Sequence, residues 1–495
     1  MKKRLRILFL SSEVAPFAKT GGLADVASAL PKALLEMGHD IRVMMPKYGT
    51  INDRRYVLRE VIRLKEIKVD INGVEHVASA KSAFIPDSKV QVYFIEYPPY
   101  FNRDDLYVDP KTKSDYPDNA ERFTMFCKSV LETIKLLHWE PQIIHCNDWQ
   151  TALIPWFLKN EYSSESFASS SKTLLSIHNM AYQGNFTVDN LEKMGIQGAS
   201  EDSLGALRYF DNINFLKAGI LTADKITTVS PTYAREVVSD PEIGAGMEEY
   251  LKQRSQDFEG ILNGVDYSEW NPATDSLIPQ TFTSEDIDAK LENKKALLKA
   301  CKFTGDEAKP LIGVVTRLAE QKGLELIVEA IPEIVKMDAR LVVLGTGEDR
   351  YHKAFKELVK KYKDNVAVFL KFDNELAHLI EAGSDLFLMP SRYEPSGLNQ
   401  MYSLKYGTIP VVRKTGGLAD SVQDYLQDPK QGNGFVFEEF TTTALVGAIQ
   451  NALNVYKDRK KWQELMVRGM TSDYSWPVAA EKYVNIYSKI IQSNK

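Results

Sequence analysis

A seven-residue segment that carries groups suited to anion binding occurs twice in the sequence. Lys19-Thr20-Gly21-Gly22-Leu23-Ala24-Asp25 recurs unchanged at residues 414–420. A Gly-Gly pair at the start of a helix lets the backbone approach an anion closely, and the unpaired N–H groups and the helix dipole favour phosphate there. Tight strand–helix turns use the same glycines, so the segment alone is compatible with either role. Neither copy is a Walker A loop, because no Gly-Lys-Ser/Thr follows.

A second group of candidate residues combines two cations with a carboxylate. Arg317 and Lys322 are five residues apart in a predicted loop between a strand and a helix. Two cations there could clamp a diphosphate, although ordinary surface charges have the same spacing. Glu394 precedes Pro395 near the start of a predicted helix, where a carboxylate could bind sugar hydroxyls or cap the helix.

Histidine and aspartate candidates follow two predicted strands. His178 closes one of them, and a catalytic imidazole and a structural one are both compatible with this position. His145 and Asp148 raise the question of a metal, but no HExxH, paired histidines or carboxylate cluster accompanies them. We therefore predict no metal site and no cofactor.

The elements that must position these residues follow an alternating pattern. Short apolar runs alternate with amphipathic helical patterns, which is typical of βαβ units in a parallel sheet. The first unit is a strand at 7–10, a helix over 23–37 ended by Gly38, and a strand at 41–45. Ligands of open parallel sheets bind at the carboxyl ends of the strands, where the candidates fall. The further predicted strands are 142–145, 174–178, 225–229, 311–316, 340–344, 366–370, 385–389 and 409–412.

Composition narrows the class of protein. A chain of 495 residues with 44% apolar side chains is typical of a folded protein with two or three domains. The net charge of −6 argues against a nucleic-acid partner. The three cysteines form no CxxC pair and indicate a reducing compartment. No stretch approaches the roughly 20 apolar residues of a membrane span, so we expect a cytoplasmic protein with no membrane partner.

In combination, the motifs resemble bacterial glycogen synthases and plant starch synthases. They occur in the order of that family from residue 5 to about residue 420. The segments that carry the resemblance are Lys19-Thr20-Gly21-Gly22-Leu23, Asn147-Asp148-Trp149, His178-Asn179 with Tyr182-Gln183-Gly184, Arg317 with Lys322, Ser391-Arg392-Tyr393-Glu394-Pro395-Ser396-Gly397-Leu398 and Thr415-Gly416-Gly417-Leu418.

The resemblance implies an α/β fold of the GT-B architecture, with two Rossmann-like domains facing one another across a deep cleft. We expect residues 1–257 to form an N-terminal domain on the acceptor side and residues 258–475 a domain on the donor side. Residues 476–495 would be a helix that crosses back to the N-terminal domain. The implied reaction transfers glucose from ADP-glucose to the non-reducing 4-hydroxyl of an α-1,4-glucan such as glycogen, with retained configuration and without a metal ion.

The resemblance also implies a role for each candidate. Arg317 and Lys322 would stabilise the departing diphosphate, and Glu394 would hold hydroxyls of the transferred glucose. His178 would lie beside the reacting carbon, with its backbone carbonyl as important as its ring. The remaining candidates would contact the substrates, either through backbone donors or through side chains: Lys19, Gly22, Asp148, Thr415, Gly416 and Gly417.

Two positions depart from related retaining transferases. Related retaining transferases have a second glutamate that binds ribose eight residues after the first. This sequence has Tyr402 at that position, as the synthase family generally does. Ser396 stands where many bacterial synthases have cysteine. A related transferase that uses UDP-glucose or a small acceptor, and a non-catalytic carbohydrate-binding homologue, are the alternative interpretations.

Overall fold

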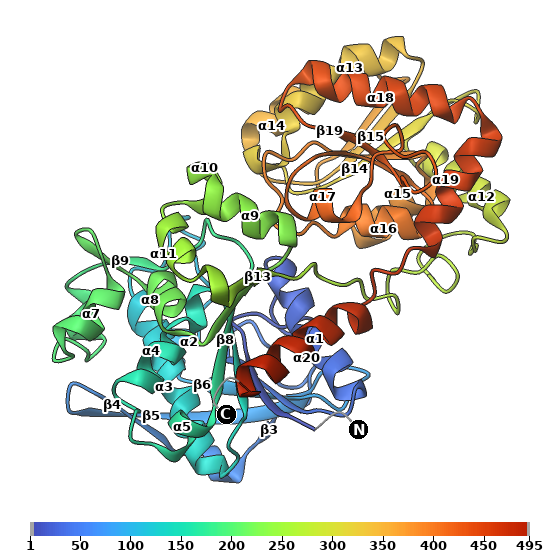
Figure 1. Ribbon diagram of the computed structural model, residues 1–495. Coiled ribbons are helices and arrows are strands. Elements are labelled where there is room, and N and C mark those ends of the chain that lie inside the picture. Colours follow the sequence, from blue (N-terminus) through green and yellow to red (C-terminus); the bar gives the residue numbers. More distant parts are fainter. Residues whose placement is uncertain (1–3, 493–495) are drawn as a thin grey trace. The chain divides into compact units, whose positions relative to one another are not determined.

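The computed structural model describes residues 4–492, which fall into two α/β units (Figure 1). Unit 1 contains residues 4–229, 234–264 and 476–492, and unit 2 contains residues 230–233 and 265–475. Within the described residues, no helix is both long enough and apolar enough to cross a membrane.

Unit 1 is built on a sheet of ten strands. Its order is β13-β12-β8-β7-β1-β2-β6-β5-β3, with β4 paired to β5. All pairs from β13 to β6 are parallel, whereas β5 runs antiparallel to β6, β3 and β4. The strands are β1 (Arg6–Leu10), β2 (Asp40–Pro46), β3 (Arg59–Glu60), β4 (Ile67–Ile71), β5 (Val74–Phe84), β6 (Gln91–Glu96), β7 (Ile143–Asn147), β8 (Lys172–Ile177), β12 (Lys225–Thr228) and β13 (Phe258–Gly260).

The helices of unit 1 follow from amphipathic patterns. In α1 (Gly22–Glu36), residues at helical spacing from Leu23 to Leu34 are buried, and Gly38 with a φ of +92° follows its C-terminus. The other helices are α2 (Pro98–Phe101), α3 (Asn119–Leu137), α4 (Leu153–Lys159), α5 (Ser166–Ser170), α6 (Asn190–Lys193), α7 (Glu201–Leu207), α8 (Phe215–Thr222), α10 (Pro241–Gly244), α11 (Glu248–Gln253) and α20 (Trp476–Gln492), while α9 (Pro231–Ser239) contains residues of both units.

His145 joins the sheet of unit 1 to the last helix. Its Nδ1 lies 2.8 Å from the hydroxyl of Tyr487 in α20, and its Nε2 lies 2.7 Å from the hydroxyl of Ser176 in β8. The ring is fully buried, which holds its pKa well below the usual value. His145 is therefore a neutral structural histidine with both ring nitrogens bonded, and α20 packs against α1 and β8.

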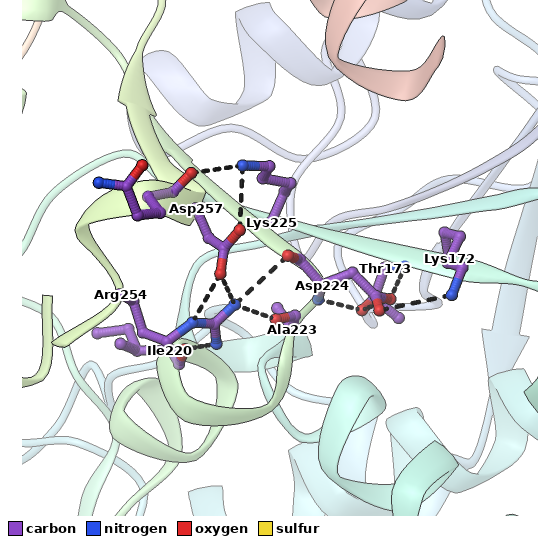
Figure 2. Close-up of polar contacts among 9 residues, drawn as sticks. Lys172, Thr173, Ile220, Ala223, Asp224, Lys225, Arg254 and Asp257 are labelled. Carbon is purple, nitrogen blue, oxygen red and sulfur yellow. Dashed lines mark hydrogen bonds and ion pairs between the residues drawn. The ribbon is translucent and has the colours of Figure 1, made fainter. Parts of the chain in front are cut away.

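A polar network at the amino ends of three strands fixes the last strand of this sheet (Figure 2). Arg254 donates to the backbone oxygens of Ile220 and Ala223, and Lys225 pairs with Asp257 at 3.0 Å. These contacts bring β13 beside β12, so residues 258–260 belong to unit 1. We expected the domain boundary after residue 257, whereas this part of unit 1 extends to residue 264. The sequence pattern does not reveal β13, because a strand of three residues has almost no periodic signal.

Unit 2 contains a parallel sheet of six strands in the order β16-β15-β14-β17-β18-β19. Helices α13 and α18 lie on one face of this sheet and α15 and α16 on the other (Figure 1). The strands are β14 (Leu311–Val315), β15 (Arg340–Leu344), β16 (Val366–Phe369), β17 (Leu386–Met389), β18 (Ile409–Arg413) and β19 (Phe435–Phe437). The helices are α12 (Lys290–Ala300), α13 (Leu324–Lys336), α14 (Asp349–Lys361), α15 (Asn374–Gly383), α16 (Asn399–Lys405), α17 (Gly416–Ser421), α18 (Thr442–Tyr456) and α19 (Arg459–Thr471).

Both sheets have the doubly wound strand order, in which the first strand lies between the second and the fourth. In unit 2 the first and fourth strands are β14 and β17. In unit 1, where β1, β2, β6 and β7 are the first four parallel strands, they are β1 and β7. The chain turns to opposite sides of the sheet after these two strands, which leaves a crevice outside their carboxyl ends. The residues that follow β1, β7, β14 and β17 are therefore the ones the fold places for ligand binding.

Candidate functional site

The loop after β1 is organised by a buried carboxylate that the sequence motifs did not single out. Glu13 accepts hydrogen bonds from the N–H and hydroxyl groups of Thr20, from the N–H of Gly21 and from the hydroxyl of Tyr107. The hydroxyl contacts measure 2.6 Å to Thr20 and 2.8 Å to Tyr107. Two backbone donors of the first Gly-Gly segment are thus already bonded within the protein. The sequence feature that could have identified Glu13 is its position between a predicted strand and a Gly-Gly pair.

The other candidates of this loop lie at its surface. Lys19 is exposed and its Nζ lies 2.7 Å from Asp25 of the same segment. Gly22 is the first residue of α1, so its N–H is one of the donors that a helix leaves unpaired at its N-terminus. A Cβ at Gly21 or Gly22 would meet nothing within 4 Å. The first copy therefore presents one cation and an open helix N-terminus to solvent.

Asp148 holds the loop that contains His178. Asp148 follows β7 with a φ of +55°, and its Oδ1 accepts from the N–H of His178 at 2.6 Å. Burial raises the pKa of Asp148 to about 7, while the backbone donors of His178 and Asn179 oppose that shift. The contact that the structure gives to this carboxylate is thus to the protein backbone, and its role toward a sugar stays a prediction.

His178 is a neutral imidazole in a defined orientation. Its Nε2 lies 2.8 Å from Oδ1 of Asn147, whose Nδ2 donates to the backbone oxygen of Leu10. The Asn147 oxygen can only accept, so Nε2 of His178 carries the proton. Burial lowers the pKa of His178 to about 3, and the ring is uncharged at neutral pH. The ring therefore brings no positive charge to the carboxyl end of β8.

In unit 2, the loops after β14 and β17 bring a lysine and a carboxylate together. Lys322 precedes α13, and its Nζ lies 2.9 and 2.7 Å from the two carboxylate oxygens of Glu394. The hydroxyl of Ser391 donates to the same carboxylate at 2.9 Å. Glu394 is 5% exposed and Lys322 is largely buried. The two candidates are 72 residues apart in sequence, and they meet because β14 and β17 are neighbours.

Arg317 lies in the same loop as Lys322 but in a different environment. Its side chain is exposed, and no carboxylate of residues 4–492 forms a salt bridge with it. Lys322 is neutralised by Glu394, whereas Arg317 offers an uncompensated positive charge after β14.

The second Gly-Gly segment packs against the Glu394 loop. The N–H of Gly417 donates to the backbone oxygen of Glu394 at 3.0 Å. A Cβ at Gly416 would lie 1.9 Å from that oxygen, and a Cβ at Gly417 would lie 1.9 Å from the backbone oxygen of Ser396. The hydroxyls of Thr415 and Ser396 are buried without a hydrogen-bond partner in the described chain. Thr415, Gly416 and Gly417 therefore shape the site of Glu394, and two unpaired hydroxyls remain there.

Tyr402, eight residues after Glu394, belongs to an aromatic stack. The centroid of its ring lies 4.1 Å from that of Trp270 with an interplanar angle of 3°, and the ring of Trp270 also stacks on that of His378, with centroids 3.8 Å apart. Within residues 4–492, no group of three or more His, Cys, Asp or Glu side chains is arranged to hold a metal ion.

Family models match both halves of the chain. The model of the starch synthase catalytic domain matches residues 6–253, and that of glycosyl transferases group 1 matches residues 301–465. A glycogen synthase of Geotalea daltonii is 45% identical over 487 residues, which is 98% of this chain and 99% of the relative. The chain belongs to the glycogen and starch synthase family. Glycogen synthase 2 of Geobacter sulfurreducens is 44% identical over 98% of both chains.

Solved structures agree with this family and its fold. The catalytic domain of starch synthase IV from Arabidopsis thaliana, bound to ADP and acarbose, has a TM-score of 0.88 and 34% identity, with 99% of this chain and 100% of that chain covered. Sucrose-phosphate synthase from Thermosynechococcus elongatus, at 16% identity and a TM-score of 0.59, shares the fold. The predicted GT-B class of two α/β units with parallel sheets is confirmed, as is the prediction of a glycosyltransferase.

Proposed function

We propose that this glycogen synthase family member transfers glucose from ADP-glucose to the non-reducing 4-hydroxyl of an α-1,4-glucan, with retention of anomeric configuration. The observation that carries the proposal is the cluster of Lys322, Glu394 and Ser391 at the switch point of unit 2, beside the uncompensated Arg317. The ADP in the starch synthase IV structure supports an adenine nucleotide as the donor.

The cations act on the leaving diphosphate. Arg317 and Lys322 stabilise the negative charge that develops as the glycosidic bond to the diphosphate breaks, as preorganised charges do in other transfer reactions. The unpaired hydroxyl of Thr415 supplies a further donor, and Gly416 and Gly417 let this segment pack closely against the Glu394 loop. In unit 1, Lys19 and the N–H of Gly22 at the start of α1 offer a positive charge and a hydrogen-bond donor to an anion. Protein groups thereby do the work of a divalent ion.

Glu394 holds the transferred glucose. Its carboxylate has about four acceptor positions, of which Lys322 uses two and Ser391 a third, so a sugar hydroxyl competes for the remainder. The diphosphate competes with Glu394 for Lys322, and its arrival releases acceptor capacity for the sugar. Donor binding and sugar orientation are coupled through this one ion pair.

His178 stabilises the reacting carbon without adding charge. A neutral ring and the backbone carbonyl of His178 suit a carbon with oxocarbenium character, which an imidazolium would repel. Asp148 fixes the position of this residue through its bond to the backbone N–H. The acceptor is a glycogen-like glucan, and the three free, buried cysteines support a cytoplasmic location.

Purified protein incubated with glycogen and either ADP-glucose or UDP-glucose tests the proposal. Labelled glucose should enter glycogen from ADP-glucose, and the product should carry new α-1,4 linkages by NMR. The rate should persist in EDTA. Preference for UDP-glucose, transfer only to a small acceptor, or activity lost in EDTA and restored by magnesium would each contradict one part of it.

A further inference from the structure

An aromatic residue at the tip of a hairpin in unit 1 is both exposed and strained. The small antiparallel sheet of unit 1 contains β9 (Asn185–Thr187), β10 (Arg208–Tyr209) and β11 (Asn212–Asn214). Phe210 is the first of the two turn residues between β10 and β11. It is 88% exposed and has a φ of +50°.

Both properties of Phe210 cost stability. Glycine, asparagine and aspartate adopt a positive φ readily, whereas a bulky side chain there is an outlier. The exposed ring also gains nothing from burial. Phenylalanine at this position is strained and gains almost no burial, and this combination indicates a function.

Phe210 belongs to a small aromatic surface, which we call the aromatic tip: Tyr209, Phe210 and Tyr250. The ring centroids of Tyr209 and Phe210 are 4.8 Å apart in an edge-to-face arrangement, and Tyr209 lies 6.4 Å from Tyr250. The hydroxyl of Tyr209 donates to the backbone oxygen of Gly246. These contacts hold Tyr209 in place beneath the exposed Phe210 ring.

The aromatic tip is anchored to the loop that carries His178. The side chain of Asn214 in β11 donates to Gln183 at 2.8 Å and to Asn185 at 2.7 Å. Gln183 in turn donates to the backbone oxygen of Ala245 at 2.9 Å. The hairpin, the 178–184 loop and the segment before Tyr250 are thus one hydrogen-bonded assembly within unit 1.

We propose that the aromatic tip is an auxiliary binding site for an α-glucan chain, an inference that rests on the proposed function. The apolar C–H face of a glucose ring packs on an aromatic face, and the exposed Asp211 and Asn212 beside Phe210 supply partners for sugar hydroxyls. The acceptor is a polymer, so a second contact on the same molecule raises its effective concentration at the reacting end. The site adds affinity for long glucans and takes no part in the transfer itself.

The test replaces Phe210 by asparagine, which suits a positive φ and lacks the ring. In Phe210→Asn, the KM for glycogen should rise by about three- to tenfold, the range expected for loss of one aromatic contact. The kcat and the KM for maltotetraose should be unchanged, and the Tm should be equal or higher. Phe84→Ala, which removes a 60% exposed phenylalanine at the end of β5, is the matched control and should change none of these values.

Three outcomes would overturn the proposal. They are an unchanged KM for glycogen, an equal loss with maltotetraose, and a lower Tm that reveals a structural role. A changed sedimentation coefficient in Phe210→Asn would assign the tip to contact with a second copy of the chain instead. Co-sedimentation of each variant with glycogen, without donor, measures the site even if the wild type transfers no glucose, so its failure is separable from that of the proposed function.

Discussion

The two copies of the KTGGLAD segment have the same seven residues and different surroundings. In the first copy Gly21 and Gly22 are exposed, and the N–H and hydroxyl groups of Thr20 donate hydrogen bonds to the carboxylate of Glu13. In the second copy, Thr415 is buried and the two glycines touch the backbone of the Glu394 loop. The first copy is therefore held by hydrogen bonds to the Glu13 side chain, whereas the second copy packs against the Glu394 loop and supports it.

Strand order explains the difference. The first copy follows β1, the first strand of the doubly wound order in unit 1, whereas the second follows β18, the fifth strand in unit 2. The two copies do not occupy equivalent positions of duplicated halves. An identical sequence thus starts α1, of 15 residues, in one place and α17, of 6 residues, in the other. The lesson is that a local motif specifies a turn, while its neighbours in the sheet decide what the turn does.

The largest expected effect concerns the cations beside the loop that the second copy supports. Arg317→Ala or Lys322→Ala should lower kcat by about 10²–10³, on the order of 3–4 kcal/mol, because each removes a preorganised charge from the transition state. Affinity for ADP should fall too, since the product carries the same charge. Initial rates and calorimetric titration of ADP measure the two quantities.

Glu394→Ala sharpens the same comparison. In the proposed roles, it should abolish most turnover, because the carboxylate would hold the sugar. ADP affinity should stay within a few-fold or rise, because Glu394 would no longer compete with the diphosphate for Lys322. Glu325→Ala, which breaks the nearby ion pair with Arg392, is the matched control and should retain turnover. A collapse of ADP affinity in Glu394→Ala, or intact affinity in both cation variants, would reverse the assigned roles.

Glycine substitutions test the contrast between the copies directly. Gly417→Ala should destabilise the protein by about 2–3 kcal/mol, since its Cβ would overlap the Ser396 carbonyl. Gly22→Ala meets open space and should change the free energy of unfolding by no more than about 1 kcal/mol. Urea denaturation of both variants decides the matter. Equal losses in the two copies would mean that their environments are alike after all.

Glu13→Gln tests whether the first copy depends on its buried carboxylate. An amide cannot accept from all four donors that now converge on Glu13, so stability should fall by about 1–3 kcal/mol. The N–H groups of Thr20 and Gly21 should exchange with solvent faster in a hydrogen-exchange measurement. Tyr107→Phe removes one donor only and should have the smaller effect. Unchanged exchange at both residues would argue against the anchoring role.

The last prediction concerns the pH dependence of stability, at Asp148. The raised pKa of about 7, against an ordinary value of 3.8, means that the folded protein binds more protons than the unfolded chain between these pH values. This carboxyl therefore lowers stability as the pH rises from about 4 to about 7. Asp148→Asn should gain stability relative to the wild type across that window and hold a constant difference above it. Urea unfolding from pH 4 to 8 measures it, and a difference independent of pH would refute the assignment.

Most of the parallel strands could be predicted, because short apolar runs in the sequence mark them. The strand expected at 340–344 is β15, and those expected at 7–10, 225–229 and 409–412 differ from the structure by one residue at an end. The strands from β3 to β6, the small sheet and β13 went unpredicted. β3, β13 and the strands of the small sheet have two or three residues each, and β4 and β5 alternate or mix polar and apolar residues, so no apolar run marks them. β6 does carry a run of four apolar residues, Val92 to Ile95, and was missed in spite of it.

The sequence likewise identified the residues of the candidate site but not their arrangement. Residue type and position after a strand were enough to identify Lys322, Glu394 and the two Gly-Gly segments, and the motifs together were enough to identify the family. The contacts among these residues could not be predicted. The ion pair between Lys322 and Glu394, the support of Glu394 by Gly417 and the burial of Glu13 arise where strands from distant parts of the chain become neighbours.

The sequence by itself determined the α/β class, most of the parallel strands and the residue types available for chemistry, because side-chain periodicity and glycine placement act over a few residues. Only the tertiary structure decided which charges are compensated, as in Lys322, and which are not, as in Arg317. It also decided that one KTGGLAD copy is open and the other buried. The physical reason is strand order: neighbours in a sheet are set by the burial of whole faces, and that burial depends on the entire chain.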